Sequence, residues 1–187
     1  TANSASKDRE AAGGDRLRAL QVLAEATSTL PGDAGVEEWL GRFLATMVRL
    51  AGAAAGAVRV VTGDGRHLRL VASIGLPPEV LAHERLMPVN CGVCGVAVAE
   101  AAVHLAQAGA ACAGVTSLAW FGGFGGMVVL PLVHQGRSLG TCNLFMRDQR
   151  TLPPEVALLY RSIGEHLGMA LENARLAREN LRMTVMN

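Results

Sequence analysis

The segment from residue 125 to residue 146 constrains the fold more than any other part of the sequence. It comprises GGMVVLPLVHQGRSLGTCNLFM, two apolar runs of strand length separated by the short polar turn HQGR. Strands joined by so short a turn pair side by side and antiparallel. Residues 57–62 and 67–74 repeat the arrangement around the Gly/Asp turn TGDGR. Two hairpins of this kind predict an antiparallel β-sheet.

Helical periodicity precedes and follows these hairpins. Apolar residues recur at three- and four-residue steps from Asp15 to Leu30, and again over residues 36–52. The pair Pro153–Pro154 then opens a third helix, which we expect to run from about Glu155 to the end of the chain. The order is helix, helix, two strands, a long connecting segment that we call the excursion, two strands and helix. It predicts an α+β fold in which helices flank an antiparallel sheet.

The last helix carries a narrow apolar seam. The seam residues follow one another at three- and four-residue steps, as in a coiled coil: Leu167, Ala170, Ala174, Ala177, Leu181 and Thr184. We therefore predict that residues 166–187 form a coiled-coil helix, which pairs with the same helix of a second copy to make a homodimer. Packing of the whole helix on its own domain is the alternative.

Charge and composition exclude several classes of partner. The formal net charge is +1 and no basic stripe with interleaved aromatic residues is present, so nucleic acid is not an expected partner. Every apolar run is broken well short of membrane-spanning length, and residues 1–14 resemble a flexible tail or linker rather than a signal peptide. We expect no direct membrane contact from this chain, whereas a longer parent protein could be anchored elsewhere. Four cysteines without a secretion signal favour the reducing cytoplasm.

Three motifs make the chain resemble a GAF domain over roughly residues 15–180. VLPLVHQGRSLGTCNLF is similar to the family pattern of a strand ending in V-P-L, a short x-x-G turn and a G-x-L-x-L strand. VRVVTGDGRHLRLVASIGLP is similar to the family's first hairpin. GVCGVAVAE falls where GAF domains place a G-x-x-G turn that opens a helix beside the ligand pocket. The resemblance implies the GAF (PAS-like) fold, with long N- and C-terminal helices. Residues 15–165 would then form the domain, and residues 166–187 its outgoing signalling helix.

The resemblance also implies a regulatory role. GAF domains mostly bind small molecules or dimerise, and they pass a conformational bias along flanking helices to an output domain. The segment GEHLGMALENARLARENLRMTVMN resembles the region before the phosphoacceptor helix of nitrate/nitrite-sensor-type histidine kinases. We therefore expect a sensory domain of a two-component signal-transduction protein, with an output kinase domain in cis and an unknown small molecule as ligand. The phosphoacceptor and ATP-binding motifs are absent from the sequence, so the chain itself is not expected to be an enzyme.

Three cysteines lie between the two hairpins, and they admit three interpretations. As metal ligands, Cys91, Cys94 and Cys112, with Cys142 or His104, would hold a zinc ion or an iron–sulfur cluster, because C-x-x-C supplies two soft ligands from one turn. As a thiol switch, Cys94 would have its pKa lowered near a helix N-terminus, and Cys91 or Cys112 would resolve its oxidised form. As core residues, the cysteines would fill a close-packed, glycine-rich turn.

An enzymatic alternative follows from a second resemblance. Free methionine-(R)-sulfoxide reductases are GAF-fold enzymes whose G-V-C-G-x-A-V turn is similar to GVCGVAV, and AGAACAG around Cys112 is similar to the segment that carries their nucleophile. The chain departs from these enzymes at other positions. Glu84 replaces a further cysteine, glycines at 125–126 replace an acid that holds the substrate ammonium, and the last strand has GTCNLF where the enzymes carry aspartates.

The segment WFGGFGG, residues 120–126, sets three aromatic residues among four glycines. Trp120, Phe121 and Phe124 would form either a hinged lid over the ligand pocket or a loop that buries its rings over the sheet edge. Together with the three cysteines of the excursion, these aromatic residues are the predicted pocket or redox residues.

Overall fold

The computed structural model describes residues 14, 18–19, 21–22, 35–107, 120, 123–148 and 151–186. The elements are, in chain order, α2 (Val36–Ala51), β1 (Ala55–Val61), β2 (His67–Ile74), α3 (Pro78–Glu84), β3 (Leu86–Pro88), α4 (Gly92–Glu100), β4 (His104–Gln107), β5 (Gly126–His134), β6 (Arg137–Met146) and α6 (Pro154–Val185). None of the helices in these described stretches combines the length and the apolarity needed to cross a membrane.

The two hairpins predicted from the sequence form the body of one six-stranded sheet. Its strand order is β3-β2-β1-β6-β5-β4, and every neighbouring pair is antiparallel. The hairpins join through β1 and β6, which therefore lie at the centre. The predicted α+β class is confirmed. The first predicted helix, from Asp15 to Leu30, falls largely outside the described residues.

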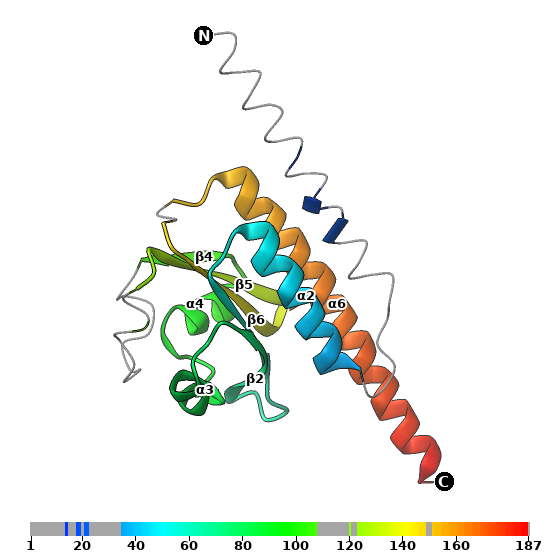
Figure 1. Ribbon diagram of the computed structural model, residues 1–187. Helices are drawn as coiled ribbons and strands as arrows, with labels where there is room; N and C mark the ends of the chain where they lie inside the picture. The colour runs from blue at the N-terminus through cyan, green and yellow to red at the C-terminus, as the bar shows by residue number, and fades with distance from the viewer. Residues whose placement is uncertain are drawn as a thin grey trace.

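The sheet separates two apolar cores. α2 and α6 cover one face, and α3 and α4 cover the other (Figure 1). Side chains alternate along a strand, so neighbouring residues enter opposite cores. Cys142 and Leu144 of β6 belong to the α2/α6 core, whereas Phe145 belongs to the α3/α4 core. The central strands are therefore buried on both sides over most of their length, and Arg59, Thr141 and Asn143 have no access to bulk water.

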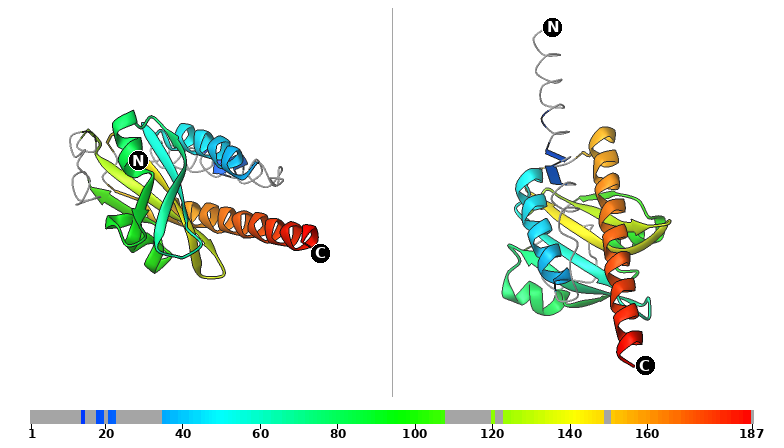
Figure 2. Two further views of the ribbon diagram at one scale, coloured as in Figure 1. Left: turned by 90° about the horizontal axis from the view of Figure 1, so that it is seen from below. Right: turned by 90° about the vertical axis from the view of Figure 1, so that its right-hand side faces the viewer.

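The backbone of α6 lies directly against the backbone of β5. A Cβ atom on Gly164 would overlap the carbonyl oxygen of Pro131, and one on Gly168 would overlap that of Val133. Only glycine permits so close an approach of a helix to a strand. Figure 2 shows α6 running along the sheet and continuing past its edge to the C-terminus. We call Gly164 and Gly168 the glycine seat of α6.

α6 is one uninterrupted helix of 32 residues that extends beyond the domain. Leu167, Ala170 and Ala174 are buried against the domain's own core. The first half of the predicted coiled-coil seam is therefore a contact within the domain, because small alanines let the helix pack on the sheet. Beyond Ala174 the helix is exposed. Ion pairs of Arg175 with the glutamates one turn before and after it, at 2.8 and 2.6 Å, support this projecting part.

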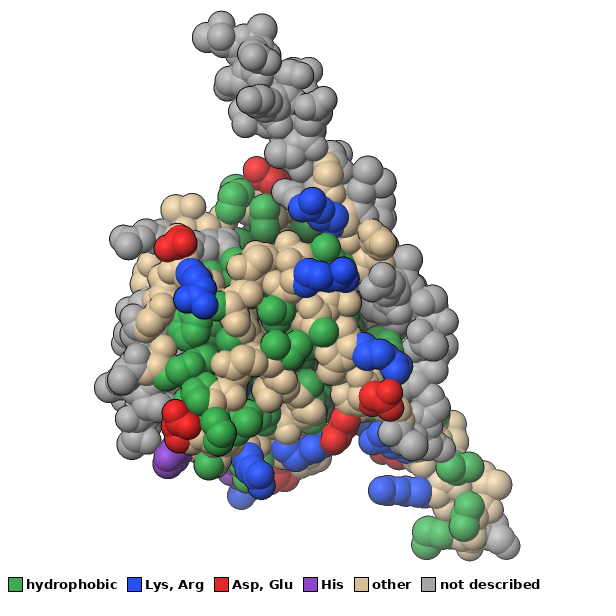
Figure 3. Space-filling view, viewed as in Figure 1, with side chains coloured by type: hydrophobic (Ala, Val, Ile, Leu, Met, Phe, Trp, Pro, Cys, Tyr) green, Lys and Arg blue, Asp and Glu red, His purple; other side chains and the backbone are tan. Residues whose placement is uncertain are grey.

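The outer face of α6 carries a different apolar stripe, which the sequence analysis did not single out. Leu158, Met169, Leu176 and Met183 follow at eleven- and seven-residue steps, so they lie on one side of the helix. Their exposed fractions are 64%, 43%, 44% and 61%. Figure 3 shows hydrophobic side chains on the projecting end of the helix. We call these four residues the outer stripe.

Gly168→Ala is expected to lower the free energy of unfolding by about 1–3 kcal/mol, because the added methyl group pushes α6 away from β5. The better helix propensity of alanine offsets at most about 1 kcal/mol of this loss. Gly41→Ala in α2 is the matched control, since nothing lies within 4 Å of its added Cβ. The control is expected to stabilise the protein by about 0.5–1 kcal/mol. Urea unfolding of both variants measures the contrast, and equal effects would contradict the glycine seat.

Candidate functional site

Four buried polar side chains meet between the sheet and the helices α3 and α4. Arg59 lies on β1, Thr141 and Asn143 lie on β6, and Glu84 ends α3. Each is at most 1% exposed, and they are the buried polar or charged residues of the described chain. The strand register places Arg59 opposite Thr141, and Asn143 opposite Ala57. We call Arg59, Glu84, Thr141 and Asn143 the buried polar cluster.

An ion pair forms one end of the cluster. The Nη2 group of Arg59 donates a hydrogen bond to Oε2 of Glu84, and both side chains are 2% exposed. Burying two charges in this way costs a large desolvation free energy, which their attraction offsets only when the remaining donors are also satisfied. The Nε and Nη1 groups of Arg59 have no partner. The pair is therefore neutral in sum but incompletely hydrogen-bonded.

The β6 residues leave two further atoms unpaired. Asn143 Nδ2 donates to Cys94 Sγ at 3.0 Å and to Met127 Sδ at 3.5 Å, so its amide nitrogen faces sulfur atoms. The Oδ1 atom of Asn143 and the Oγ1 atom of Thr141 have no partner. Together with the two Arg59 groups, these are all the unpartnered buried side-chain atoms in the described residues. Each such atom costs about 1–3 kcal/mol, and folded proteins keep few of them.

The glycine-rich turn GVCG lies over this cluster. Cys91 is the N-cap of α4, and Cys94 lies in the first turn of the helix, where it meets Asn143. A Cβ on Gly95 would overlap the backbone of Asn90, so the helix starts pressed against the preceding turn. The C-x-x-C spacing thus belongs to a tight turn of small residues that covers a polar site.

The cysteines of this turn are not activated. Burial raises the pKa of Cys94, and the guanidinium of Arg59 lowers it by a smaller amount. Burial also raises the pKa of the half-buried Cys91, and the nearby carboxylate of Glu84 adds to the effect. The prediction of a lowered pKa at Cys94 is therefore wrong, because burial disfavours the thiolate more than the nearby guanidinium and the Asn143 amide favour it.

The predicted metal set does not come together in the described residues. Cys142 lies in the α2/α6 core, on the opposite side of the sheet from Cys94, and burial raises its pKa to about 12. His104 is hydrogen-bonded to Glu100, with 2.8 Å between Nε2 and Oε2. No group of three candidate ligands occurs among the described residues. Cys112, the fourth member, lies outside them.

Two of the three predicted aromatic residues pack on the sheet beside the cluster. The rings of Trp120 and Phe124 have centroids 5.1 and 5.6 Å from that of Phe145 on β6, and 4.7 Å from each other. Phe145 follows Asn143 by two residues on the same face of the strand. These rings thus form an apolar wall next to the polar cluster. Phe121 lies outside the described residues.

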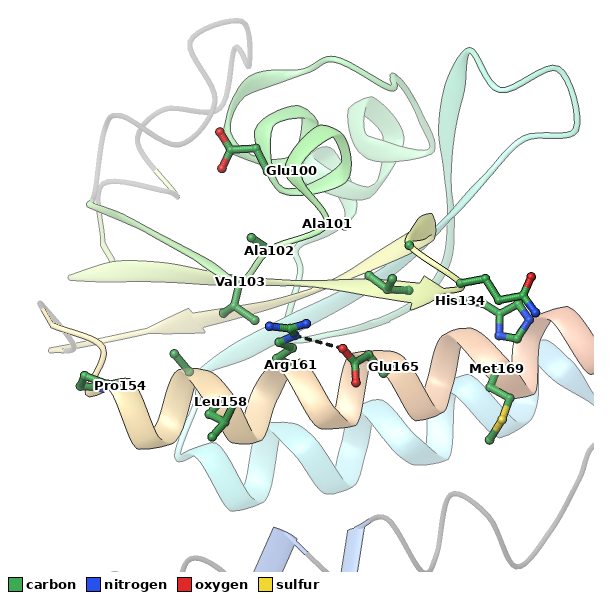
Figure 4. Close-up of a pocket in the computed structure, with 14 residues that line it drawn as sticks. Glu100, Ala101, Ala102, Val103, His134, Pro154, Leu158, Arg161, Glu165 and Met169 are labelled. Atoms are coloured by element: carbon green, nitrogen blue, oxygen red, sulfur yellow. Dashed lines mark hydrogen bonds and ion pairs between the residues drawn. The ribbon is translucent and has the colours of Figure 1, made fainter.

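A groove of about 810 Å³ opens elsewhere, between the end of α4, the β5–β6 turn and α6. Figure 4 shows the ion pair of Arg161 and Glu165, 3.0 Å long, inside this groove. The four unpartnered buried atoms of the described chain do not line it. We therefore place the candidate site at the buried polar cluster, where hydrogen-bonding groups lack partners, rather than at this groove.

The sequence analysis identified the GVCG turn that covers the site, but it missed the buried polar cluster beneath that turn. The signals were a single arginine in the apolar strand VRVV and the polar residues of GTCNLF. At alternate positions of a strand that is buried on both faces, such residues must point into a core. Glu84 carried no local signal, since its partner lies 25 residues earlier in the chain.

Comparisons with known proteins agree with this architecture. The family model described as GAF domain matches residues 33–172. No curated protein sequence matches the chain. Among solved structures, the GAF domain of a phosphoenolpyruvate-protein phosphotransferase from Coxiella burnetii is 17% identical, with a TM-score of 0.70 over 86% of this chain and 96% of that one.

Two further solved structures differ from each other in activity. Free methionine-R-sulfoxide reductase from Neisseria meningitidis, in complex with its substrate, is 17% identical, with a TM-score of 0.69 over 87% of this chain and 91% of that one. The phycoerythrobilin-bound GAF domain of a cyanobacterial phytochrome is 15% identical, with a TM-score of 0.63 over 86% of this chain and 97% of that one. At these identities the similarity shows the fold alone.

Arg59→Met is expected to destabilise the protein by about 3–5 kcal/mol, because it leaves the Glu84 carboxylate buried without its partner. The double variant Arg59→Met/Glu84→Leu removes both charges and is expected to regain wild-type stability or to exceed it. Chemical denaturation of the wild type, the two single variants and the double variant gives the coupling free energy. A double variant as unstable as the sum of the single variants would show that the two charges do not interact.

Proposed function

The chain belongs to the GAF domain family, and we propose that it is the sensory domain of a signalling protein, which binds a small molecule at the buried polar cluster. One observation carries the proposal: all four unpartnered buried side-chain atoms of the described residues lie in this one place. A ligand that pairs with them recovers the free energy that their burial without partners costs. Ligand binding there would therefore select one packing of the surrounding elements.

The path from the site to α6 is short. Thr141 of the cluster pairs with Pro131 of β5, and the carbonyl oxygen of Pro131 lies against Gly164 in the glycine seat. The hydroxyl of Ser138 on β6 also donates to the carbonyl oxygen of Val98 on α4, at 2.9 Å. A shift of β6 on ligand binding would thus act on α4 and, through β5, on α6. We propose that this shift moves α6 relative to the sheet.

We propose that α6 leads to an output domain in cis, most consistent with a histidine kinase of the nitrate/nitrite-sensor type, in the cytoplasm. The resemblance of the last segment to that kinase group supports the output. The free thiols of Cys91, Cys94 and Cys142 support a reducing compartment. In this proposal two copies pair along the outer stripe of α6, which stays exposed in the single chain.

Cysteine chemistry is the alternative stimulus. The raised pKa values of Cys91 and Cys94 weigh against a thiol switch in this conformation, because the thiolate is the reactive form. They weigh equally against activity as a free methionine-(R)-sulfoxide reductase, in which a partner thiol must close a disulfide. Cys112, the nucleophile that the resemblance implies, lies outside the described residues, so this alternative rests on sequence similarity alone.

The coupling is tested by replacing the cluster's polar groups on β6 with apolar ones of similar size. Thr141→Val/Asn143→Leu is expected to change backbone hydrogen exchange in α6 around Gly164 several-fold more than in α2. The control is Leu68→Val, a buried change on β2 in the same core. It should alter exchange in α2 and α6 alike, through global stability alone. If the change in hydrogen exchange is the same in α6 as in α2 for both variants, the proposed coupling of the cluster to α6 is refuted.

Dimerisation is tested along the outer stripe. Leu176→Glu is expected to weaken self-association at least tenfold, because it buries a charge in the apolar contact. Arg178→Gln is the matched control, since it changes net charge by the same amount at an exposed position away from the stripe. Sedimentation equilibrium of the three proteins measures the dimer constants. A wild-type chain that stays monomeric at every concentration would remove dimerisation from the proposal.

A further inference from the structure

The chemistry of the unpaired atoms restricts what the site can hold. We propose that the buried polar cluster binds a small neutral molecule whose hydrogen-bond acceptor and donor sit on neighbouring atoms, such as a carboxamide or a urea. This inference rests on the proposed function, because it names the class of ligand that the sensory site recognises. It depends on the charge balance of the cluster, on the types of its unpaired atoms and on their spacing.

Charge balance favours a neutral ligand. Arg59 and Glu84 neutralise each other, and they are the charged members of the buried polar residues in the described chain. A carboxylate ligand at Arg59 would add a second negative charge beside Glu84, and an ammonium ligand would add a second positive charge beside Arg59. In a buried, low-dielectric site such like-charge contacts cost much more than in water. A neutral molecule avoids both costs.

The unpaired atoms require both an acceptor and a donor. The Nε and Nη1 groups of Arg59 can only donate, so they need an acceptor oxygen on the ligand. The Oδ1 atom of Asn143 can only accept, so it needs a donor. The hydroxyl of Thr141, between them in the register, can serve either partner. A carboxamide offers a carbonyl oxygen to Arg59 and an N–H group to Asn143.

The spacing suits one such group. Thr141 and Asn143 are two residues apart on β6, and strand geometry separates such residues by about 6.6 Å. Their side chains therefore lie next to each other on one face of β6, and Arg59 is directly opposite Thr141 on β1, so that neighbouring atoms of one small group can reach all three residues. The surroundings are apolar, with Ala57, Met127 and Val129 in the same core. An apolar substituent on the ligand suits these surroundings better than a charged one.

The test uses three small probes of different charge and hydrogen-bonding capacity: propanamide, its isostere propanoate, and propylammonium. Each is titrated into the ¹⁵N-labelled chain, and the Arg59 Nε–H and Asn143 side-chain signals are followed. Propanamide is expected to shift both signals saturably and to bind at least tenfold more tightly than either ion. The side-chain amide of Asn180, exposed on α6, serves as the internal control and should not move.

Variants at Thr141 show whether the shifts arise in the cluster. Thr141→Val is expected to weaken propanamide binding several-fold, whereas Thr141→Ser keeps the hydroxyl and should retain it. If Thr141→Val fails to fold, the proposal is still tested by the ranking of the three probes and by the comparison of the wild type with Thr141→Ser. Binding that is unaffected by the loss of the hydroxyl would place the propanamide site elsewhere and overturn the proposal.

The remaining outcomes separate the ligand class from the sensory role. Tighter binding of propanoate would make the cluster an anion site, and tighter binding of propylammonium a cation site; either result overturns the neutral class. No saturable shift from any probe would mean that water alone satisfies the cluster, which also overturns it. None of these results changes the exchange response of α6 to Thr141→Val/Asn143→Leu, which tests the sensory relay by itself.

Discussion

Strand β6 is the constraint on which the rest of the structure depends, because both of its faces are buried. It lies between β1 and β5, so each residue must suit one of two cores. Cys142 and Leu144 fill the core beneath α2 and α6, whereas Asn143 contacts Cys94 of α4 on the opposite side. Next to it, β5 touches α6 backbone to backbone at the glycine seat. No flexible side chain lies in that contact to absorb a displacement, so a movement of the central strands must be shared by the helix.

The hairpins, the helices and the fold class could be predicted from the sequence, because each depends on local patterns. Turn residues between apolar runs specify antiparallel pairing, and apolar residues at three- and four-residue steps specify helices. The turn GVCG was also recognisable, since Gly95 permits the close contact with Asn90 that opens α4. In each of these cases the residues that decide the structure are close in sequence.

The buried polar cluster could not be predicted in the same way, and neither could the side of α6 that packs on the domain. The cluster joins Arg59, Glu84, Thr141 and Asn143, which meet only when the central strands pair and α3 folds over them. The alanines of α6 fit a coiled-coil seam and a close helix–sheet contact equally well, and only the tertiary fold shows that Ala170 and Ala174 face inward. The cysteines drew attention through their spacing, whereas their reactivity depends on burial, which the sequence does not display.

The energetic balance of the cluster argues for function rather than for stability. A chain selected only for stability gains nothing from a buried ion pair with unpaired donors, because apolar residues of similar volume serve at least as well. The same holds for the hydroxyl of Thr141 and the amide of Asn143, each of which leaves a buried atom unpartnered. Deviations from locally favourable chemistry concentrate at functional sites, where a bound partner supplies the missing interactions. The buried polar cluster beneath α4 is such a deviation. It lies on the opposite face of the sheet from the glycine seat, to which Thr141 is linked through its strand partner Pro131, and this link is the basis of the proposed relay to α6.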